Sequence, residues 1–391
     1  VLTMISYDNA VEKEFVKSHL WSKCKLILLI YYLRNRALKN NMDFRIDYVK
    51  LFSPPKKDLD IIIQDYKVII DKISAGKANE LSESDTLYLG ACTKGASAEK
   101  STVPQYYYAP DTVAKKRAFC FKISYMTYIL NNYIVANEET YEPILKESGL
   151  LDGKTFEQYV ISKIDAYSGK TDKELCEIFG REYNNNKAQW SDLAYRMLGI
   201  KSNKAEEFVK AQIVVKAIRL EKNGTMRESS PLPSICFKEL VDEKWEESEI
   251  FRYFDETRFL FVVYNNIGTE YVLAGCQMWN MPYKDLNVTV RKGWEEVKKT
   301  VKDGVVFTRV KQKNGNIIKN NLPKKNDNPI IHIRPHTQNT YYVFENGEKL
   351  GKGTLADSDE LPDGRRMTKQ SFWINNSYIV TQLDKKLAQN A

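Results

Sequence analysis

One pattern of residues occurs twice in this chain, and the repeat limits the folds that the chain can adopt. Between Leu87 and Leu130, an apolar entry precedes a turn with Lys94, a polar loop, a cationic cluster, an aromatic strand and an apolar helix. The same order returns between Ile330 and Leu383, where the turn carries Arg334 and His336. If a whole domain is duplicated, other elements should also recur in the same order.

Three further pairs of segments keep that order. They are Lys25 and Arg258 before apolar runs, Pro55 and Pro282 before acidic helix starts, and Tyr66 to Gly76 and Trp294 to Gly304 within helices. The chain has 391 residues, beyond the ~250–300 at which one core usually divides. We therefore expect two related domains, at residues 1–150 and 151–391, with the boundary at Asp152-Gly153. The predicted class is α/β in a mixed α+β arrangement, each domain a mixed sheet flanked by helices.

Hydrophobic periodicity predicts the individual elements. Strands are expected at Val1–Ile5, Leu26–Leu33, Ile46–Phe52, Gln212–Ile218, Arg258–Tyr264 and Tyr271–Met278, and helices at Asp58–Ala75, Phe156–Ala166 and Asp285–Lys302. Residues 131–151 are expected to form a helical tail and linker. Thr171 and Glu174 have the spacing of a capping box. Residues 311–325 predict a basic hairpin with its turn at Asn314-Gly315.

Composition narrows the class of protein. The net charge of +8 favours a polyanionic partner. The six cysteines form no CxxC pair, which predicts reduced thiols and no zinc site. The apolar run near Leu26–Leu33 is far shorter than the ~20 residues of a membrane helix, and no signal peptide opens the chain. A cytoplasmic protein is expected. Because the chain opens with Val1 in a strand-like pattern, we also expect that sequence upstream of Val1 is missing.

The motifs exclude several kinds of chemistry. The sequence contains no Gly-x-Ser-x-Gly elbow and no GxxxxGK[ST] phosphate loop, and its three histidines have no evident nucleophilic partner. Metal-assisted phosphodiester chemistry remains. It requires clustered carboxylates that hold Mg²⁺ and a lysine that orients or stabilises the attacking water.

A family resemblance supports this chemistry. It rests on Lys23 before an apolar strand, the Tyr66–Gly76 helix, Tyr88-Leu followed by Lys94-Gly-Ala-Ser-Ala, and Lys116-Arg117-x-Phe119. With these motifs the chain resembles the mismatch-repair endonuclease MutH and the type II restriction endonucleases that cut at GATC. The resemblance covers nearly the whole chain. It implies an active MutH-like domain followed by a degenerate MutH-like domain that binds DNA without cutting, and Mg²⁺ as the cofactor.

The resemblance also implies where catalysis should reside. The family's Asp…Glu-x-Lys signature lies on a strand just before the position of Val1, and this sequence does not contain it. Of the family's active-site residues only an additional lysine is matched, at Lys23, so the chain as given is expected to be inactive. In the second domain, Glu207 and Lys216 stand at signature positions and Val214 replaces a carboxylate. This set implies a degenerate site.

The family's DNA contacts map onto the two turns and the two cationic strand approaches. The residues implied are Lys94, Lys115, Lys116, Arg117, Arg334, His336, Arg365, Arg366 and Lys369. Arginine or lysine can donate to guanine in the major groove, while other cations neutralise phosphates. Cys92 stands where the family has an arginine in the first turn. Phe119, Phe372 and Trp373 are expected in the core.

The implied partners are double-stranded DNA containing GATC and a cognate methyltransferase of the same bacterial restriction-modification system. Pairing of two molecules on DNA is a further expectation. Two alternatives stay open: a DNA-binding or regulatory module that does not cut, and an unrelated basic globular protein, against which the ordered repeats argue. Without the resemblance, the cations at Lys115–Arg117 also fit an ordinary solvated face, and Lys23 fits a surface lysine at a strand entry.

Overall fold

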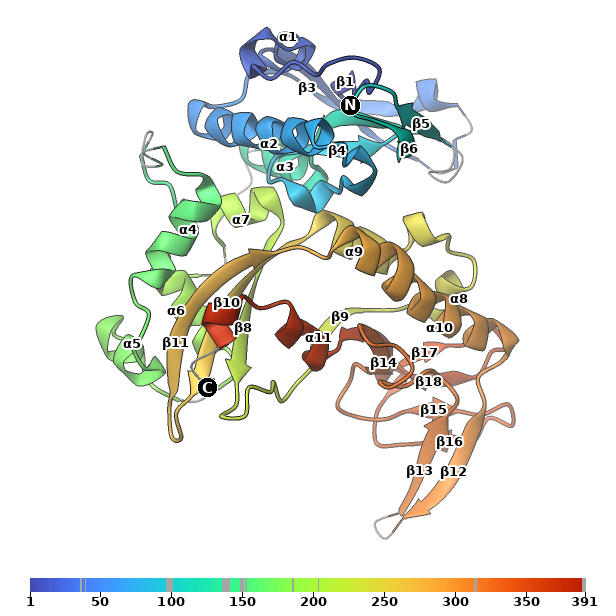
Figure 1. Cartoon of the computed structure of the whole chain (residues 1–391). Helices are drawn as coiled ribbons and strands as arrows, with labels where there is room; N and C mark the ends of the chain where they lie inside the picture. The colour runs from blue at the N-terminus through green and yellow to red at the C-terminus, as the bar shows by residue number, and fades with distance from the viewer. Residues whose placement is uncertain are drawn as a thin grey trace. The chain divides into compact units, whose positions relative to one another are not determined.

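The computed structural model describes residues 1–35, 37–38, 40–95, 101–135, 141–147, 151, 153–184, 186–202, 204–312 and 315–388 (Figure 1). The chain divides into two compact units. One comprises Val1–Ala217, Glu256–Val262 and Gly275–Asn280, and the other comprises Ile218–Asp255, Val263–Ala274 and Met281–Ala391. Asp152 of the predicted boundary lies outside the described residues. The division at 150/151 therefore stays a prediction.

Residues 3–129 form a set of elements that we call the first series. They are β1 (Thr3–Met4), α1 (His19–Cys24), β2 (Ile27–Leu33), β3 (Arg45–Phe52), α2 (Lys56–Ser74), β4 (Leu89–Thr93), β5 (Thr102–Gln105), β6 (Ala109–Lys115), β7 (Arg117–Phe121) and α3 (Ile123–Ile129). Strand β7 lies between β1 and β4 and is antiparallel to both. Two antiparallel pairs, β2 with β3 and β5 with β6, complete the strands of this series.

Residues 230–381 form a second series. Its elements are β9 (Ser230–Ser234), α8 (Phe237–Leu240), α9 (Glu249–Glu256), β10 (Arg258–Asn266), β11 (Tyr271–Trp279), α10 (Arg291–Asp303), β14 (Ile331–Pro335), β19 (Gln370–Ile374) and α11 (Asn376–Thr381). Strand β19 lies between β9 and β14, as β7 lies between β1 and β4. A π-helix, Asp285–Val290, precedes α10 and completes the helix predicted at 285–302.

Further elements extend the second series. Strands β12 (Phe307–Gln312) and β13 (Gly315–Asn320) form the predicted basic hairpin, although Asn314 lies outside the described residues. A small sheet contains β15 (Tyr342–Val343), β16 (Lys349–Leu350), β17 (Ser358–Glu360) and β18 (Arg366–Thr368). The last helix is α12 (Lys385–Ala388).

Helices also occupy the segment between the two series. They are α4 (Phe156–Asp165), α5 (Asp172–Ile178), α6 (Gln189–Met197) and α7 (Glu206–Ala211), followed by β8 (Ile213–Leu220). The capping box of α5 is confirmed, because Thr171 and Glu174 each donate a backbone N–H to the other's side chain. Of the predicted helical tail, a π-helix at Leu130–Ile134 is found, and residues 136–140 and 148–150 lie outside the described residues.

The fold class is mixed α/β with several small sheets. All six cysteines are free thiols, as predicted. In the described ranges, no helix combines the length and the apolar character that crossing a membrane requires.

The start of β4 is fixed by the buried carboxylate of Asp65 in α2. It accepts backbone N–H groups from Leu87 at 2.8 Å, Tyr88 at 2.6 Å and Leu89 at 2.9 Å. Burial raises the pKa of Asp65 to about 6, against the opposing effect of these hydrogen bonds and of Lys122. The carboxylate therefore orients the strand at a cost in desolvation.

In the second series, a side-chain amide instead of a carboxylate accepts the backbone N–H groups at the start of the corresponding strand. Gly293 precedes Trp294 as Asp65 precedes Tyr66, and a Cβ atom on Gly293 would lie 2.8 Å from the side-chain nitrogen of Asn328. The Asn328 Oδ1 atom accepts N–H groups from Ile330 at 3.0 Å and Ile331 at 3.1 Å. A neutral side chain thus binds the start of β14.

Replacing Asp65 with asparagine should change how stability depends on pH. Because the folded-state pKa of Asp65 lies above its unfolded value, its stabilising contribution is present below pH ~4 and is lost as the pH rises through 6, by up to about 3 kcal/mol. Urea unfolding between pH 4 and 7 should show a smaller loss of stability for Asp65→Asn than for the wild type. Asp71→Asn, an exposed site on the same helix, is the control. Equal pH dependence of wild type and Asp65→Asn would contradict the assignment.

Candidate nucleic-acid interface

The first candidate edge lies where β4 ends and β7 begins. Cys92 is opposite Ala118, and just beyond this pair the backbone N–H of Lys94 donates to the carbonyl of Lys116 at 2.8 Å. Because side chains alternate across a strand, Cys92, Lys94 and Lys116 lie on one face. Lys116 is exposed, and Cys92 and Lys94 are half-buried. We call Lys94 and Lys116 the first edge, and Cys92 lies beside it.

The corresponding edge of the second series has a matching register. Arg334 is opposite Ser371, and the backbone N–H of His336 donates to the carbonyl of Lys369 at 2.9 Å. Arg334 and His336 are exposed, Lys369 is half-buried, and His336 Nδ1 lies 3.1 Å from Ser371 Oγ. We call Arg334, His336 and Lys369 the second edge. Lys94 and Lys116 of the first edge therefore correspond in position to His336 and Lys369 of the second edge, which carries Arg334 as a third predicted cation.

The aromatic residues near these edges differ in burial. Phe119 and Phe372 are buried, as predicted. Trp373 was expected in the core, but it is half-buried, and the Arg334 guanidinium lies over its ring at 4.4 Å. The expectation for Trp373 was wrong because strand alternation turns it to the face opposite Phe372.

Arg117 faces the protein interior. It is 2% exposed, and its guanidinium donates to the carbonyl oxygens of Leu81 and Ala91. A guanidinium committed to backbone carbonyls in this way has no surface to offer a nucleic acid. We therefore assign Arg117 to folding and omit it from the DNA contacts proposed below.

Arg365 and Arg366 are also engaged within their own unit. Arg365 donates to the carbonyl of Val305 at 2.6 Å and to Asp363 at 2.6 Å, and Arg366 donates to Ser358 Oγ at 3.0 Å. Arg365 and Arg366 are therefore also omitted from the DNA contacts proposed below. Lys115, the last residue of β6, is half-buried, and its backbone carbonyl accepts a hydrogen bond from the Tyr7 hydroxyl at 3.2 Å. The predicted contact of its side chain with DNA stays a prediction.

The residues expected in catalytic positions are dispersed. Lys23 is exposed in the last turn of α1. Glu207 is buried, and its carboxylate accepts the N–H groups of Ile144 at 2.8 Å and Leu145 at 3.0 Å. Burial raises the pKa of Glu207. This carboxylate therefore anchors a loop.

The other two residues of the expected degenerate site lie on β8. Val214 and Lys216 are half-buried and, two residues apart, share one face of the strand. Burial lowers the pKa of Lys216. The positions of Lys23, Glu207, Val214 and Lys216 do not test their predicted roles. The catalytic role of Lys23 and the degenerate site therefore stay predictions.

Two carboxylates do meet a lysine elsewhere in the first unit. Lys210 Nζ lies 2.7 Å from Asp58 Oδ1 and 2.8 Å from Glu206 Oε1, and Lys57 Nζ lies 2.6 Å from Glu206 Oε1. Tyr125 donates its hydroxyl to Asp58 at 2.9 Å. Burial alone would raise the pKa of Glu206, but Lys210 and Lys57 outweigh burial and lower it. Two positive and two negative charges are thus balanced.

This cluster, which we call the Lys210 network, was missed by sequence reasoning. Lys210 and Asp58 are 152 positions apart, and the acidic pairs that contain Asp58 and Glu206 are typical of helix starts. The side chain of Lys210 is 1% exposed. The burial of Lys210 and Asp58 and the balanced charge make the network a structural link between α2 and α7.

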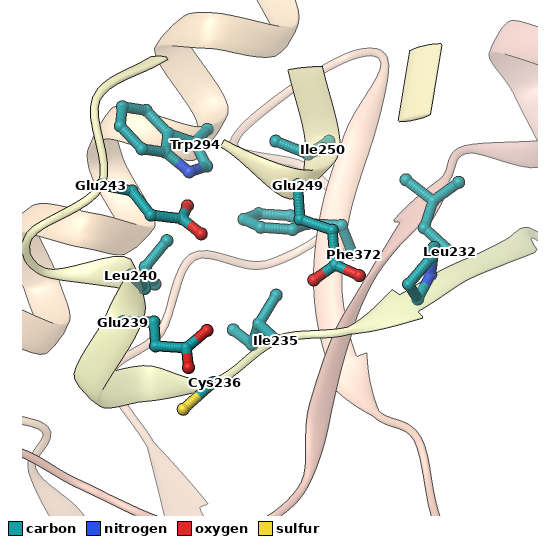
Figure 2. Close-up of a pocket in the computed structure, with 11 residues that line it drawn as sticks. Leu232, Ile235, Cys236, Glu239, Leu240, Glu243, Glu249, Ile250, Trp294 and Phe372 are labelled. Carbon is teal, nitrogen blue, oxygen red and sulfur yellow. The ribbon is translucent and has the colours of Figure 1, made fainter. Parts of the chain in front are cut away.

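A small acidic pocket lies in the second unit. Figure 2 shows the carboxylates of Glu239, Glu243 and Glu249 directed toward one space beside Trp294 and Phe372. Burial raises the pKa of both Glu243 and Glu249. The pocket volume is about 30 Å³, which holds about one or two water molecules and no base or sugar. Sequence spacing gave no signal for it.

The described residues do not fit a Mg²⁺ site. In these ranges no group of three His, Cys, Asp or Glu side chains is placed to hold a metal ion. No metal-dependent step is therefore assigned to any of them.

The Lys210 network should contribute to stability. Lys210→Met leaves the carboxylates of Asp58 and Glu206 buried without their shared partner, which should cost about 3–5 kcal/mol of unfolding free energy. Lys57→Met, which removes the partly exposed second cation from Glu206, should cost about 1 kcal/mol or less. Urea denaturation measures both. Equal losses in the two variants would show that Lys210 is not the central charge.

Comparison with known proteins connects this geometry to a family. The family model described as DNA mismatch repair enzyme MutH matches residues 1–65. The type II restriction enzyme Sau3AI of Staphylococcus aureus is 35% identical over 413 aligned residues, which cover 99% of this chain and 83% of that enzyme. The expected resemblance is confirmed, and the chain belongs to the MutH-related family of type II restriction enzymes.

Proposed function

We propose that this chain recognises GATC in double-stranded DNA as part of a type II restriction endonuclease. The observation that carries the proposal is the matched pair of edges, in which exposed or half-buried cations occupy corresponding positions at the ends of two antiparallel strand pairs. Cations at a strand end can reach base edges while neighbouring cations neutralise phosphates. Family membership supplies DNA as the substrate class.

We further propose that the two series are tandem MutH-like domains. Both have a central strand flanked by two antiparallel strands, preceded by a hairpin and a long helix and followed by a short helix. Both bind the start of one strand through a buried side-chain oxygen, from Asp65 or Asn328. Such agreement in order, register and local chemistry supports duplication.

The hairpins of the two series suggest where the catalytic carboxylates belong. Strand β10 lies between β8 and β11, and its residues 259–265 are buried. Among the described residues, β2 pairs only with β3, and its Leu28, Ile30 and Tyr32 are at least half exposed. Exposed apolar side chains beside an open strand edge favour a covering strand. We infer that this strand carries the Asp…Glu-x-Lys signature, beside β2 as β8 lies beside β10.

In this proposal the intact enzyme hydrolyses phosphodiester bonds with Mg²⁺ held by that signature and with Lys23 as the supporting lysine. The second domain binds DNA and does not cut, because Val214 stands in place of a carboxylate. The expected setting is the bacterial cytoplasm, with a cognate methyltransferase and with two molecules pairing on DNA. A binding module that never cuts is the second candidate, favoured because no group of three His, Cys, Asp or Glu side chains in the described residues is placed to hold a metal ion.

DNA binding by residues 1–391 tests the proposal. Fluorescence anisotropy should show tighter binding to a GATC duplex than to a permuted duplex, with the preference persisting when salt is raised. Lys116→Ala and Lys369→Ala should each weaken binding to both duplexes alike and reduce the salt slope by about one, as expected for phosphate contacts. A denaturing gel with Mg²⁺ should show no cleavage.

Lys67→Ala is the matched control, because Lys67 is an exposed lysine of α2 outside both edges. It should leave affinity and salt slope unchanged. Equal, salt-sensitive binding to both duplexes would reduce the function to non-specific DNA binding. Cleavage would show that the catalytic carboxylates lie among residues 1–391.

A further inference from the structure

The register of β14 and β19 places an aromatic ring under the exposed arginine of the second edge. His332 is opposite Trp373, and Arg334 is opposite Ser371, so Arg334 and Trp373 are diagonal neighbours on one face. The guanidinium carbon of Arg334 lies 4.4 Å from the ring centroid of Trp373. At this distance the ring attracts the cation through its face.

Arg334 keeps its hydrogen-bond donors available. In the part of the chain that the structure describes, its guanidinium forms neither an ion pair nor a hydrogen bond, and the residue is exposed. By contrast, Arg365 and Arg366 donate to side-chain and backbone oxygens of their own unit. Arg334 is thus held by a ring face, which leaves its planar fork of N–H groups free.

Beside the first edge, different residues occupy the same two positions. Cys92 is opposite Ala118 and Gly90 is opposite Cys120, so Cys92 corresponds to Arg334 and Cys120 to Trp373. Cys120 is buried, and its thiol donates to the carbonyl of Gly90 at 3.7 Å. Neither cysteine supplies a cation or a ring. The two edges therefore differ at the place where the second edge holds its arginine.

We propose that Trp373 is a positioning residue for sequence readout, which holds the Arg334 guanidinium in place to donate to a guanine edge, and that the first edge makes no equivalent contact. This inference rests on the proposed recognition of GATC. A guanidinium that is already oriented loses less conformational freedom on binding than a free one. Its fork matches the O6 and N7 acceptors of guanine in the major groove.

Two measurements distinguish a role of Trp373 in sequence readout from a role in folding: the ratio of affinities for two duplexes and the urea midpoint. Loss of an oriented base contact lowers the ratio of affinities for GATC and permuted duplexes. Loss of local folding lowers both affinities together and lowers the urea midpoint. The salt slope reports phosphate contacts, so it should not respond to Trp373.

The test measures this affinity ratio for full-length variants by fluorescence anisotropy at two salt concentrations. Arg334→Ala should lower the ratio about 5- to 150-fold, the range of one bidentate base contact. Trp373→Leu should lower it by about 3- to 10-fold, with an unchanged salt slope, because the arginine remains but is no longer held. Trp373→Phe should fall between wild type and Trp373→Leu. Cys92→Ala should leave the ratio unchanged.

A double-mutant cycle covers the case in which Trp373→Leu does not fold. Once Arg334 is replaced by alanine, Trp373→Phe should have no further effect on the ratio. An effect of the same size with and without Arg334 would overturn the positioning role, as would equal loss of affinity for both duplexes in the Trp373 variants. A reduced ratio in Cys92→Ala would overturn the asymmetry between the edges. If the wild type itself shows no preference for GATC, the result contradicts the proposed function and not the role of Trp373 in particular.

Discussion

The contact between a buried side-chain oxygen and the start of an edge strand determines where the residues that we propose to contact DNA can lie. Asp65 provides it for β4 and Asn328 for β14. Each oxygen binds backbone N–H groups at one end of a five-residue strand, and the candidate cations follow at the other end. Because the strand is short and paired over its whole length, fixing its start also fixes its far end.

The two oxygens achieve this at different electrostatic cost. The carboxylate of Asp65 accepts three N–H groups but loses hydration when it is buried, which raises its pKa to about 6. The amide of Asn328 carries no charge, and it reaches the strand from a loop because Gly293 leaves space on the helix. The backbone N–H groups at a strand start are therefore bound by an aspartate of a helix in the first series and by an asparagine of a loop in the second.

The cations of this protein divide into structural and exposed groups that are adjacent in sequence. Lys116 is exposed while Arg117 donates to carbonyls in the core, because successive residues of a strand point to opposite faces. The Lys210 network likewise uses two lysines to neutralise carboxylates in the first unit. Net charge therefore overstates the number of cations available to DNA.

The sequence by itself determined many of the strands, the long helices, the capping box at Thr171 and the basic hairpin, because periodicity and capping depend on near neighbours. The spacing of motifs also identified the family. Only the tertiary structure decided that Arg117 is internal, that Arg334 stacks on Trp373 and that Lys210 meets Asp58. These outcomes depend on the register of strands and the packing of helices that lie far apart in the chain, which local patterns do not encode.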